Sequence, residues 1–351
     1  MRIVQILESF AWGDAIGNHV QALDNLFARA GLEHAVLANA IDPRLKTRAR
    51  HVSLYDAKPS DLILYHLSTG SDLNFSVATY PGRLVINYHN ITPAHFFEGY
   101  NERAAASCAS GREGLRYLAK YAQHAIAVSD YNAHELEEAR YRCPVDVVPI
   151  LLDMRHLGSS YPMGNHGRGF VDGLPTRVLF VGRIAPNKRI ERVIEDFTYI
   201  KRIDPRAKLT LVGNAGGMES YLLKLRKYVR KLRLADVEFQ GHVSLDVMVN
   251  HFRMADVFLC ESAHEGFCVP LVEAMHFGLP IVAQDCSAVG DTLGEGGLLL
   301  TRDDPREAAR AVDLVLRSTE LRERIKVGQR FQLDRFNPDA VGQMYLKILG
   351  F

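Results

Sequence analysis

The stretch RVLFVGRIAPNKRIERVI, residues 177–194, runs from a buried strand into a helix. Its apolar run ends at Gly182, and apolar side chains then recur at helical spacing from Ile190 to Ile194. A strand followed at once by a helix is the repeating unit of a parallel α/β sheet. The stretch therefore predicts a doubly wound domain.

The same alternation of short apolar runs and helical segments extends along the whole chain. We expect strands at 2–7, 33–38, 61–66, 83–89 and 125–129 in the first half, and at 177–182, 208–213, 237–241, 257–262 and 280–284 in the second. Between the halves, a segment rich in Gly, Pro and Ser has the composition of a linker. The prediction is an N-terminal domain at 1–156, a linker at 157–176 and a C-terminal domain at 177–335.

Composition and charge exclude several classes of protein. The 351 residues are 47% hydrophobic and 24% charged, and 42 basic against 41 acidic residues leave a net charge of +1, which gives no support to nucleic-acid binding. Five cysteines without a CxxC pair indicate reduced thiols rather than a zinc site or a disulfide framework. The start, MRIVQILESF, is too short and too polar for a signal peptide, and no apolar run reaches the ~20 residues of a membrane span. We therefore expect a cytoplasmic protein.

Arg183 and Lys188 follow the strand at 177–182 and precede a helix. Basic side chains at the carboxyl end of a strand, beside a helix N-terminus, are suited to binding an anion. A solvated basic loop is an equally good interpretation of these two residues taken alone.

The stretch EGFCVPLVEA, residues 265–274, places two glutamates in apolar surroundings. Pro270 fits the first turn of a helix, so the backbone amides of the loop before it are free to face an anion. Glu265 and Glu273 would then lie on either side of the anion, where carboxylates suit vicinal sugar hydroxyls. The alternative for Glu273 is a first-turn acid that interacts with the helix dipole, worth ~0.3–1 kcal/mol.

These motifs resemble those of family 4 of the retaining glycosyltransferases, which have the GT-B fold. The resemblance rests on GR-x4-K at 182–188 and EGF-x-x-P-x-x-EA-x-x-x-G-x-P at 265–280, and it extends over nearly the whole chain. It implies two Rossmann-like, doubly wound α/β domains that face each other across a cleft. In this family the last helix typically returns to the first domain, so residues 336–351 are expected there.

The resemblance also implies roles for individual residues of the second half. Arg183 and Lys188 would neutralise the diphosphate of the donor, Glu265 would contact the transferred sugar, and Glu273 would bind the ribose diol. The remaining donor-binding residues of this half would be Gly182, Gly213, His242, Val243, Gly266, Phe267, Cys268 and Val269. For His242 a surface-loop histidine is an equally good interpretation, and Cys268 stands where the family often has glycine.

In the first half, His89 falls where the family often has a histidine near the sugar, and His66 is a weaker case of the same kind. A strand-end histidine with a structural role is the alternative. The family commonly has a Gly-Gly pair after the first strand, whereas here Gly13 and Gly17 are separated. Either glycine could let the backbone approach the diphosphate.

The predicted function is hexose transfer with retention, from a nucleotide-diphosphate sugar to a hydroxyl of a saccharide or lipid-linked saccharide. GDP-mannose is placed slightly ahead of UDP-sugars, in surface polysaccharide or glycolipid synthesis. Neither a cofactor nor a metal ion is expected, and a peripheral contact with the inner face of the membrane is left open. The alternatives are a UDP-sugar transferase, an epimerase or phosphorylase of the same fold, and a non-catalytic two-domain sugar-binding protein.

Overall fold

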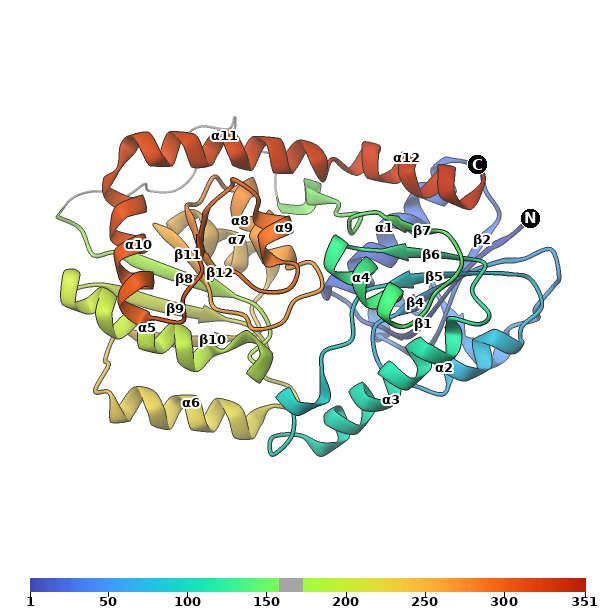
Figure 1. Cartoon of the computed structure of the whole chain (residues 1–351), viewed down its shortest axis with the longest axis horizontal. Coiled ribbons are helices and arrows are strands. Elements are labelled where there is room, and N and C mark those ends of the chain that lie inside the picture. Colours follow the sequence, from blue (N-terminus) through green and yellow to red (C-terminus); the bar gives the residue numbers. More distant parts are fainter. Residues whose placement is uncertain (158–172) are drawn as a thin grey trace. The chain divides into compact units, whose positions relative to one another are not determined.

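The computed structural model describes residues 1–157 and 173–351, and it divides into two compact units (Figure 1). The N-terminal unit comprises residues 1–95, 102–153 and 335–351, and the C-terminal unit comprises 96–101 and 154–334. Most of the predicted linker, 157–176, falls on residues 158–172 and lies outside the described part of the chain.

Two short segments lie in a different unit from the one that the sequence suggested. Residues 96–101, expected in the first domain, belong to the C-terminal unit, where Asn101 donates a hydrogen bond to the carbonyl of Gly217 at 2.7 Å. Residues 154–156, expected in the first domain, and Leu157, expected in the linker, also belong to the C-terminal unit, and Leu157 is buried in its core. Both differences arise from contacts of individual residues with the C-terminal unit, which a change of composition along the chain does not show.

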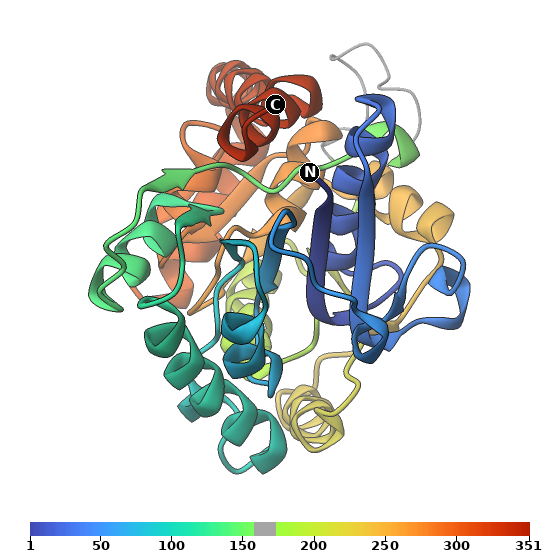
Figure 2. The same ribbon diagram turned by 90° about the vertical axis from the view of Figure 1, so that its right-hand side faces the viewer.

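The N-terminal unit is built on a seven-stranded parallel sheet with the order β3-β2-β1-β4-β5-β6-β7. Its strands are β1 (Ile3–Phe10), β2 (His34–Ile41), β3 (Arg50–His51), β4 (Leu62–Leu67), β5 (Arg83–Tyr88), β6 (His124–Ala127) and β7 (Val145–Val147). Its α-helices are α1 (Ala15–Arg29), α2 (Leu73–Ser76), α3 (Glu102–Leu118), α4 (Asp130–Glu138) and α12 (Pro338–Leu349). Figure 2 gives the end-on view of this unit, with helices on either side of the strands.

The last helix, α12, is part of the N-terminal unit. Val341, Tyr345 and Leu349 are fully buried there, in one apolar cluster with side chains of α1 and of strands β1, β4, β5 and β6. Asn337 caps the helix by accepting hydrogen bonds from the amides of Asp339 and Ala340. Burial of these three large side chains fixes α12 on the unit that contains β1.

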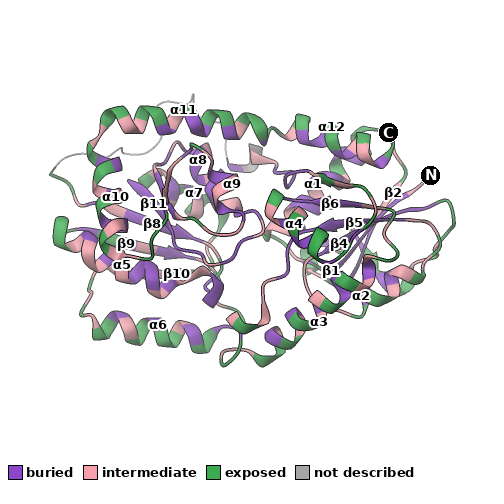
Figure 3. Cartoon of the chain, in the orientation of Figure 1, coloured by how far each residue is buried: buried purple, intermediate pink, exposed green. Residues whose placement is uncertain are grey.

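The C-terminal unit has a six-stranded parallel sheet with the order β10-β9-β8-β11-β12-β13. Its strands are β8 (Arg177–Val181), β9 (Lys208–Val212), β10 (Val237–Gly241), β11 (Val257–Cys260), β12 (Ile281–Gln284) and β13 (Leu298–Leu300). Its α-helices are α5 (Ile190–Ile203), α6 (Glu219–Lys231), α7 (Leu245–Met254), α8 (Val269–His276), α9 (Val289–Leu293), α10 (Pro305–Arg317) and α11 (Thr319–Arg335). Figure 3 shows mostly buried residues in the strands of both units and alternating burial along the helices.

The predicted fold class, two doubly wound α/β domains with parallel sheets, is confirmed. In each sheet the strand order reverses beside the first strand, between β1 and β4 and between β8 and β11. Ligands of such sheets bind beyond the carboxyl ends of the strands at this switch point. Within the described residues, no helix has both the length and the apolar character that crossing a bilayer requires.

Candidate functional site

The switch point of the C-terminal sheet brings the predicted anion-binding residues together. Arg183 and Lys188 follow β8, and Glu265 follows β11, the neighbouring strand. Residues that are far apart in sequence are therefore placed side by side by the order of the strands. All of these residues belong to the C-terminal unit.

Glycines end three adjacent strands of this sheet. The amide of Gly182, after β8, donates to the carbonyl of Val212, and the amide of Gly213, after β9, donates to the carbonyl of Gly241, at 3.0 and 2.9 Å. A Cβ atom on Gly213 would lie 1.7 Å from the carbonyl oxygen of Gly182, and the φ angle of Gly213 is 155°. Close backbone packing within the chain is therefore sufficient reason for glycine at 213.

Arg183 is exposed and forms no ion pair with any described residue. One guanidinium nitrogen, Nη2, donates to the carbonyl of Gly216 at 3.2 Å, so the side chain lies along the loop that follows β9. A guanidinium without a carboxylate partner keeps most of its donors available for an anion.

Lys188 and Glu265 form an ion pair in which Nζ of Lys188 lies 2.5 Å from Oε1 of Glu265. Ser262 donates a hydrogen bond to the same carboxylate oxygen at 2.7 Å, and the Glu265 amide donates to Oγ of Ser287 at 2.7 Å. Burial alone would lower the pKa of Lys188, but the adjacent Glu265 carboxylate outweighs it and the pKa is raised. The lysine is thus held as a cation at the end of β8.

Helix α8 begins directly after the loop that carries Glu265. Cys268 is the N-cap residue and has a left-handed backbone with φ of 70°, and Pro270 lies in the first turn. The backbone amides of Gly266, Cys268 and Val269 have no acceptor among the described residues. Phe267 is anchored through its carbonyl, which accepts a hydrogen bond from Thr292 at 2.5 Å. The loop therefore presents N–H groups at a helix N-terminus, where an anion is stabilised.

Glu273 lies in the second turn of α8, because the helix begins at Val269. The expectation of a first-turn acid is therefore wrong, and the helix dipole, which acts on the first turn, does not account for Glu273. Its half-buried carboxylate makes no hydrogen bond or ion pair with the described residues. Burial raises the pKa of Glu273 to about 7. A carboxylate that is partly removed from water and has no protein partner is suited to accept hydrogen bonds from a ligand.

The remaining two predicted residues of this unit follow β10. His242 is exposed, and Val243 is half-buried against the core of the C-terminal unit. Neither contacts the Lys188–Glu265 pair through a hydrogen bond. Their predicted place in a base pocket stays a prediction.

A partly buried ionic cluster beside the site was not foreseen from the sequence. Nε of Arg192 lies 3.2 Å from oxygens of both Asp196 and Asp303 and 3.9 Å from Glu261, the residue directly after β11. Burial raises the pKa values of Asp196 and Glu261. Arg189, which starts α5 from a left-handed backbone, also binds Asp303. The cluster ties α5 to the ends of β11 and β13 and thereby fixes the turn that carries Lys188.

In the N-terminal unit, the two glycines after β1 have different reasons to be glycine. A Cβ atom on Gly17 would lie 1.9 Å from the carbonyl oxygen of Ala11, so this residue packs against its own chain. Gly13 has φ of 78° and open space where its Cβ would be. Asp14 caps α1 by accepting a hydrogen bond from the Gly17 amide at 2.5 Å. Of the two, only Gly13 leaves its backbone open to a ligand.

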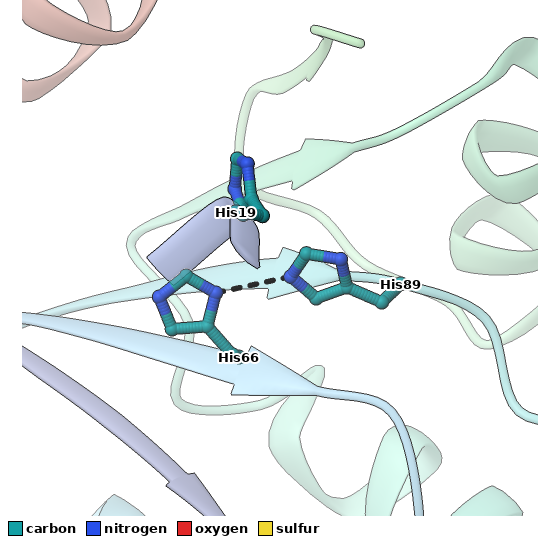
Figure 4. Close-up of side chains that lie close together, drawn as sticks. All are labelled: His19, His66 and His89. Carbon is teal, nitrogen blue, oxygen red and sulfur yellow. Dashed lines mark hydrogen bonds between the residues drawn. The ribbon is translucent and has the colours of Figure 1, made fainter. Parts of the chain in front are cut away.

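His89 lies at the end of β5 in a cluster with His19 and His66 (Figure 4). All three are buried, and Nδ1 of His66 lies 3.0 Å from Nε2 of His89. His19, which α1 contributes, was not among the predicted residues, and His66 was only a weaker candidate. The available signal was strand register: His66 pairs with Asn87 of the neighbouring strand, and His89 lies two residues further on, so both histidines lie on the same face of the sheet.

Comparison with known proteins shows what this part of the chain is similar to. Residues 169–330 match the model of the family described as glycosyl transferases group 1. An uncharacterized glycosyltransferase of Methanocaldococcus jannaschii is 25% identical over 73% of this chain and 68% of its own length. The D-inositol 3-phosphate glycosyltransferase of Jonesia denitrificans is 25% identical over 61% of this chain. The match spans about half of the length of that enzyme, 53%.

Solved structures show the same fold. HepE of Anabaena in complex with UDP-glucose has a TM-score of 0.76 at 19% identity, and the match covers 99% of both chains. Sucrose-phosphate synthase of Thermosynechococcus elongatus has a TM-score of 0.76 at 16% identity, over 99% of this chain and 98% of that one.

Two doubly wound units with basic residues, a glutamate and a helix N-terminus at a switch point, together with these matches, support a GT-B-type glycosyltransferase. The matched part of the chain, residues 169–330, resembles the group 1 glycosyl transferases. The resemblance read from its motifs is thereby confirmed.

Proposed function

We propose that this protein transfers a hexose from a nucleotide-diphosphate sugar to an acceptor hydroxyl, with retention at the anomeric carbon. The observation that carries the proposal is the set of groups around the start of α8. Arg183 has no carboxylate partner among the described residues, Lys188 is held as a cation, and the amides of Gly266, Cys268 and Val269 are free of described protein acceptors. Lys188 and these N–H donors lie at the ends of the neighbouring strands β8 and β11, and Arg183 follows β8 at the same edge of the sheet, a setting suited to a diphosphate.

In the proposed step, the acceptor oxygen forms a bond to the anomeric carbon as the bond from that carbon to the diphosphate oxygen breaks. The bonding electron pair leaves with the nucleoside diphosphate, and the acceptor's proton passes to the departing phosphate oxygen. Attack from the face that the phosphate leaves retains the configuration. Arg183, Lys188 and the amides would stabilise the charge that develops on the leaving group, so we propose that no metal ion is obligatory. Undiminished transfer in the presence of excess EDTA is the expected result.

The two glutamates would hold hydroxyl groups on either side of the diphosphate. Glu265 keeps one oxygen, Oε2, outside the contacts with Lys188 and Ser262, and we assign it to the transferred sugar. Glu273 has both carboxylate oxygens free of described partners and is assigned to the ribose diol. In the N-terminal unit, Gly13 and His89 are assigned to the diphosphate and the sugar.

GDP-mannose is the donor we propose, with UDP-glucose as the principal competitor, because the similar HepE structure contains UDP-glucose. The proposed acceptor is a saccharide or lipid-linked saccharide of surface polysaccharide or glycolipid synthesis. A setting at the inner face of the membrane agrees with the exposed basic side chains of α6, among them Arg226, Lys227 and Arg230.

A thermal-shift screen with GDP, UDP, dTDP and ADP tests the donor. A ligand present at 100 times its dissociation constant adds ~2.7 kcal/mol to the free energy of unfolding, so the cognate nucleotide should stand out. GDP is expected to give the largest shift, and hydrolysis or transfer is then measured with the matching sugar nucleotide. A protein that binds a sugar nucleotide but neither hydrolyses nor transfers it would be the binding module. If none of the four nucleotides raises the unfolding temperature, the proposal is contradicted.

Nucleotide affinity is expected to rise between pH 6 and pH 8 because Glu273, with a pKa of about 7, accepts ribose hydroxyls best when it is ionised. The stability of the free protein changes with pH in the opposite direction. The carboxyl has its ordinary pKa when unfolded, so its stabilising contribution is complete below that value and is lost as the pH rises through 7. Calorimetric titration of the screened nucleotide at several pH values measures the first effect.

Glu273→Gln is the matched control for this titration, because the nucleotide's own terminal phosphate also ionises in the same range. The variant keeps the shape of the side chain and removes its charge change. An equally steep pH dependence in both proteins would remove Glu273 from the nucleotide site.

A further inference from the structure

The three buried histidines of the N-terminal unit carry an inference beyond the contact assigned to His89. They are contributed by α1, β4 and the end of β5, and Figure 4 shows His66 directed at His89 with His19 beside both. Their ring centroids lie 5.2–5.7 Å apart. Three imidazoles in such a group can bind a metal ion or form a chain of hydrogen bonds, and the partners of each nitrogen decide between these.

His19 has no lone pair to give to a metal ion. Its Nδ1 accepts a hydrogen bond from the backbone amide of Leu151 at 2.9 Å, so in the neutral ring the hydrogen is on Nε2, which lies 3.1 Å from the side-chain amide group of Asn87. A metal ligand needs a free lone pair on one nitrogen and places its other nitrogen in a hydrogen bond. The lone pair of Nδ1 is used by Leu151 and Nε2 carries the hydrogen, so only two of the three rings could face an ion.

The hydrogen positions on the other two rings follow from a carbonyl that can only accept. Nε2 of Gln5 donates to the backbone carbonyl of Val20 at 3.4 Å, which turns the Gln5 oxygen toward Nε2 of His66 at 3.1 Å. That oxygen accepts, so Nε2 of His66 carries the hydrogen. A neutral His66 then accepts at Nδ1.

The next link follows in the same way. Nε2 of His89, 3.0 Å from Nδ1 of His66, must donate its hydrogen. Nδ1 of His89 is left as a lone pair, and this buried atom has no hydrogen-bond partner among the described residues. Burial lowers the pKa values of His19, His66 and His89, so all three rings are neutral near pH 7 and the assignment of one hydrogen per ring holds.

We propose that His66, held by Gln5, is a positioning residue that fixes the hydrogen of His89 on Nε2 and leaves Nδ1 of His89 as an acceptor for a ligand hydroxyl. The proposal rests on the proposed function, since it takes the contact between His89 and the sugar as given. It adds which atom of His89 makes that contact and which kind of ligand group this atom selects. A neutral acceptor selects a hydroxyl group, whereas a histidine cation or an N–H at Nδ1 would favour a phosphate or carbonyl oxygen.

We call the hydrogen-bonded series Gln5–His66–His89 the histidine relay. Nitrogen NMR of the full chain with ¹⁵N-labelled histidine tests this relay without any substrate, because imidazole nitrogens with and without hydrogen have different chemical shifts. We expect His66 and His89 each to carry hydrogen on Nε2 at pH 7. A hydrogen on Nδ1 of His89, a cationic His89, or stoichiometric zinc bound to the purified protein would overturn the proposal.

His66→Leu and His66→Asn form the matched pair of variants. Leucine removes the acceptor, so His89 should populate both hydrogen positions and kcat/KM for transfer should fall about tenfold, the effect of one lost hydrogen bond. Asparagine can place its oxygen near the former Nδ1, so it should restore the Nε2 hydrogen of His89 and most of the rate.

Two measurements separate the relay from a general loss of structure. The affinity for the screened nucleotide, measured by calorimetry, should be unchanged in both variants, because its predicted contacts are chiefly in the C-terminal unit. If His66→Leu leaves the hydrogen position and kcat/KM unchanged, the relay is wrong. If the wild-type protein transfers no sugar, the proposed function fails, and the NMR assignment still decides the relay.

Discussion

Replacing Lys188 by alanine lowers the rate of sugar transfer by ~10²–10³-fold, about 2.7–4 kcal/mol of transition-state stabilisation. The expected loss is this large because Lys188 is fixed before the donor arrives: its Nζ lies 2.5 Å from Glu265, and only 19% of its side chain is exposed. A cation that is already in place needs no reorganisation when charge develops on the leaving diphosphate. Arg183→Ala should give a similar loss of transfer, with little effect on stability because Arg183 is exposed. Steady-state kcat/KM with the screened donor measures both.

The ion pair complicates the Lys188 variant, and a double substitution removes the complication. Lys188→Ala leaves the Glu265 carboxylate, 8% exposed, without its counter-charge, which costs stability as well as activity. In Lys188→Ala/Glu265→Gln the unpaired charge is gone, so the midpoint of thermal unfolding should return toward that of the wild type. The transfer rate should remain low. Recovery of transfer in the double variant would show that the lysine acts only by neutralising Glu265, and the phosphate-binding role would be withdrawn.

The sequence predicted the two parallel sheets because short continuous apolar runs such as that at 177–182 are typical of buried parallel strands. It missed β3, β7 and β13, which have two or three residues each and therefore carry no periodicity. It also extended the strand at 257–262 through Glu261 and Ser262, although β11 ends at Cys260. These two polar residues leave the sheet because Glu261 faces Arg192 of α5 and Ser262 donates a hydrogen bond to Glu265.

The motifs predicted which residues come near the start of α8 but not how they contact one another. Lys188 and Glu265 were assigned to different parts of the donor, yet in the free protein they bind each other. The reason is that β8 and β11 are neighbours in the sheet, a fact that depends on strand order and not on spacing along the chain. The sequence did not predict the histidine relay for the same reason, because Gln5, His66 and His89 come from three adjacent strands.

Replacing Gly213 by alanine should destabilise the C-terminal unit by about 3–5 kcal/mol, the combined order of an overpacked site and a strained backbone. The new methyl group would lie 1.7 Å from the carbonyl oxygen of Gly182, and the φ angle of 155° is one that alanine rarely adopts. Neither group can move easily, since Gly182 and Gly213 are both bonded to neighbouring strands through their amides. Denaturant unfolding, followed by hydrogen exchange of β8 and β9, measures the loss in this unit.

Gly241→Ala is the matched control, because Gly241 ends the adjacent strand with φ of 69° and a methyl group there would have no described heavy atom within 4 Å beyond its own chain neighbours. It carries only the cost of a left-handed backbone, ~1–2 kcal/mol. The pair also separates two reasons for a glycine at 213. If the residue is glycine because a ligand approaches it, Gly213→Ala would weaken nucleotide binding and leave stability near that of Gly241→Ala. The contact with Gly182 predicts the reverse order, with loss of stability first and loss of binding only as its consequence.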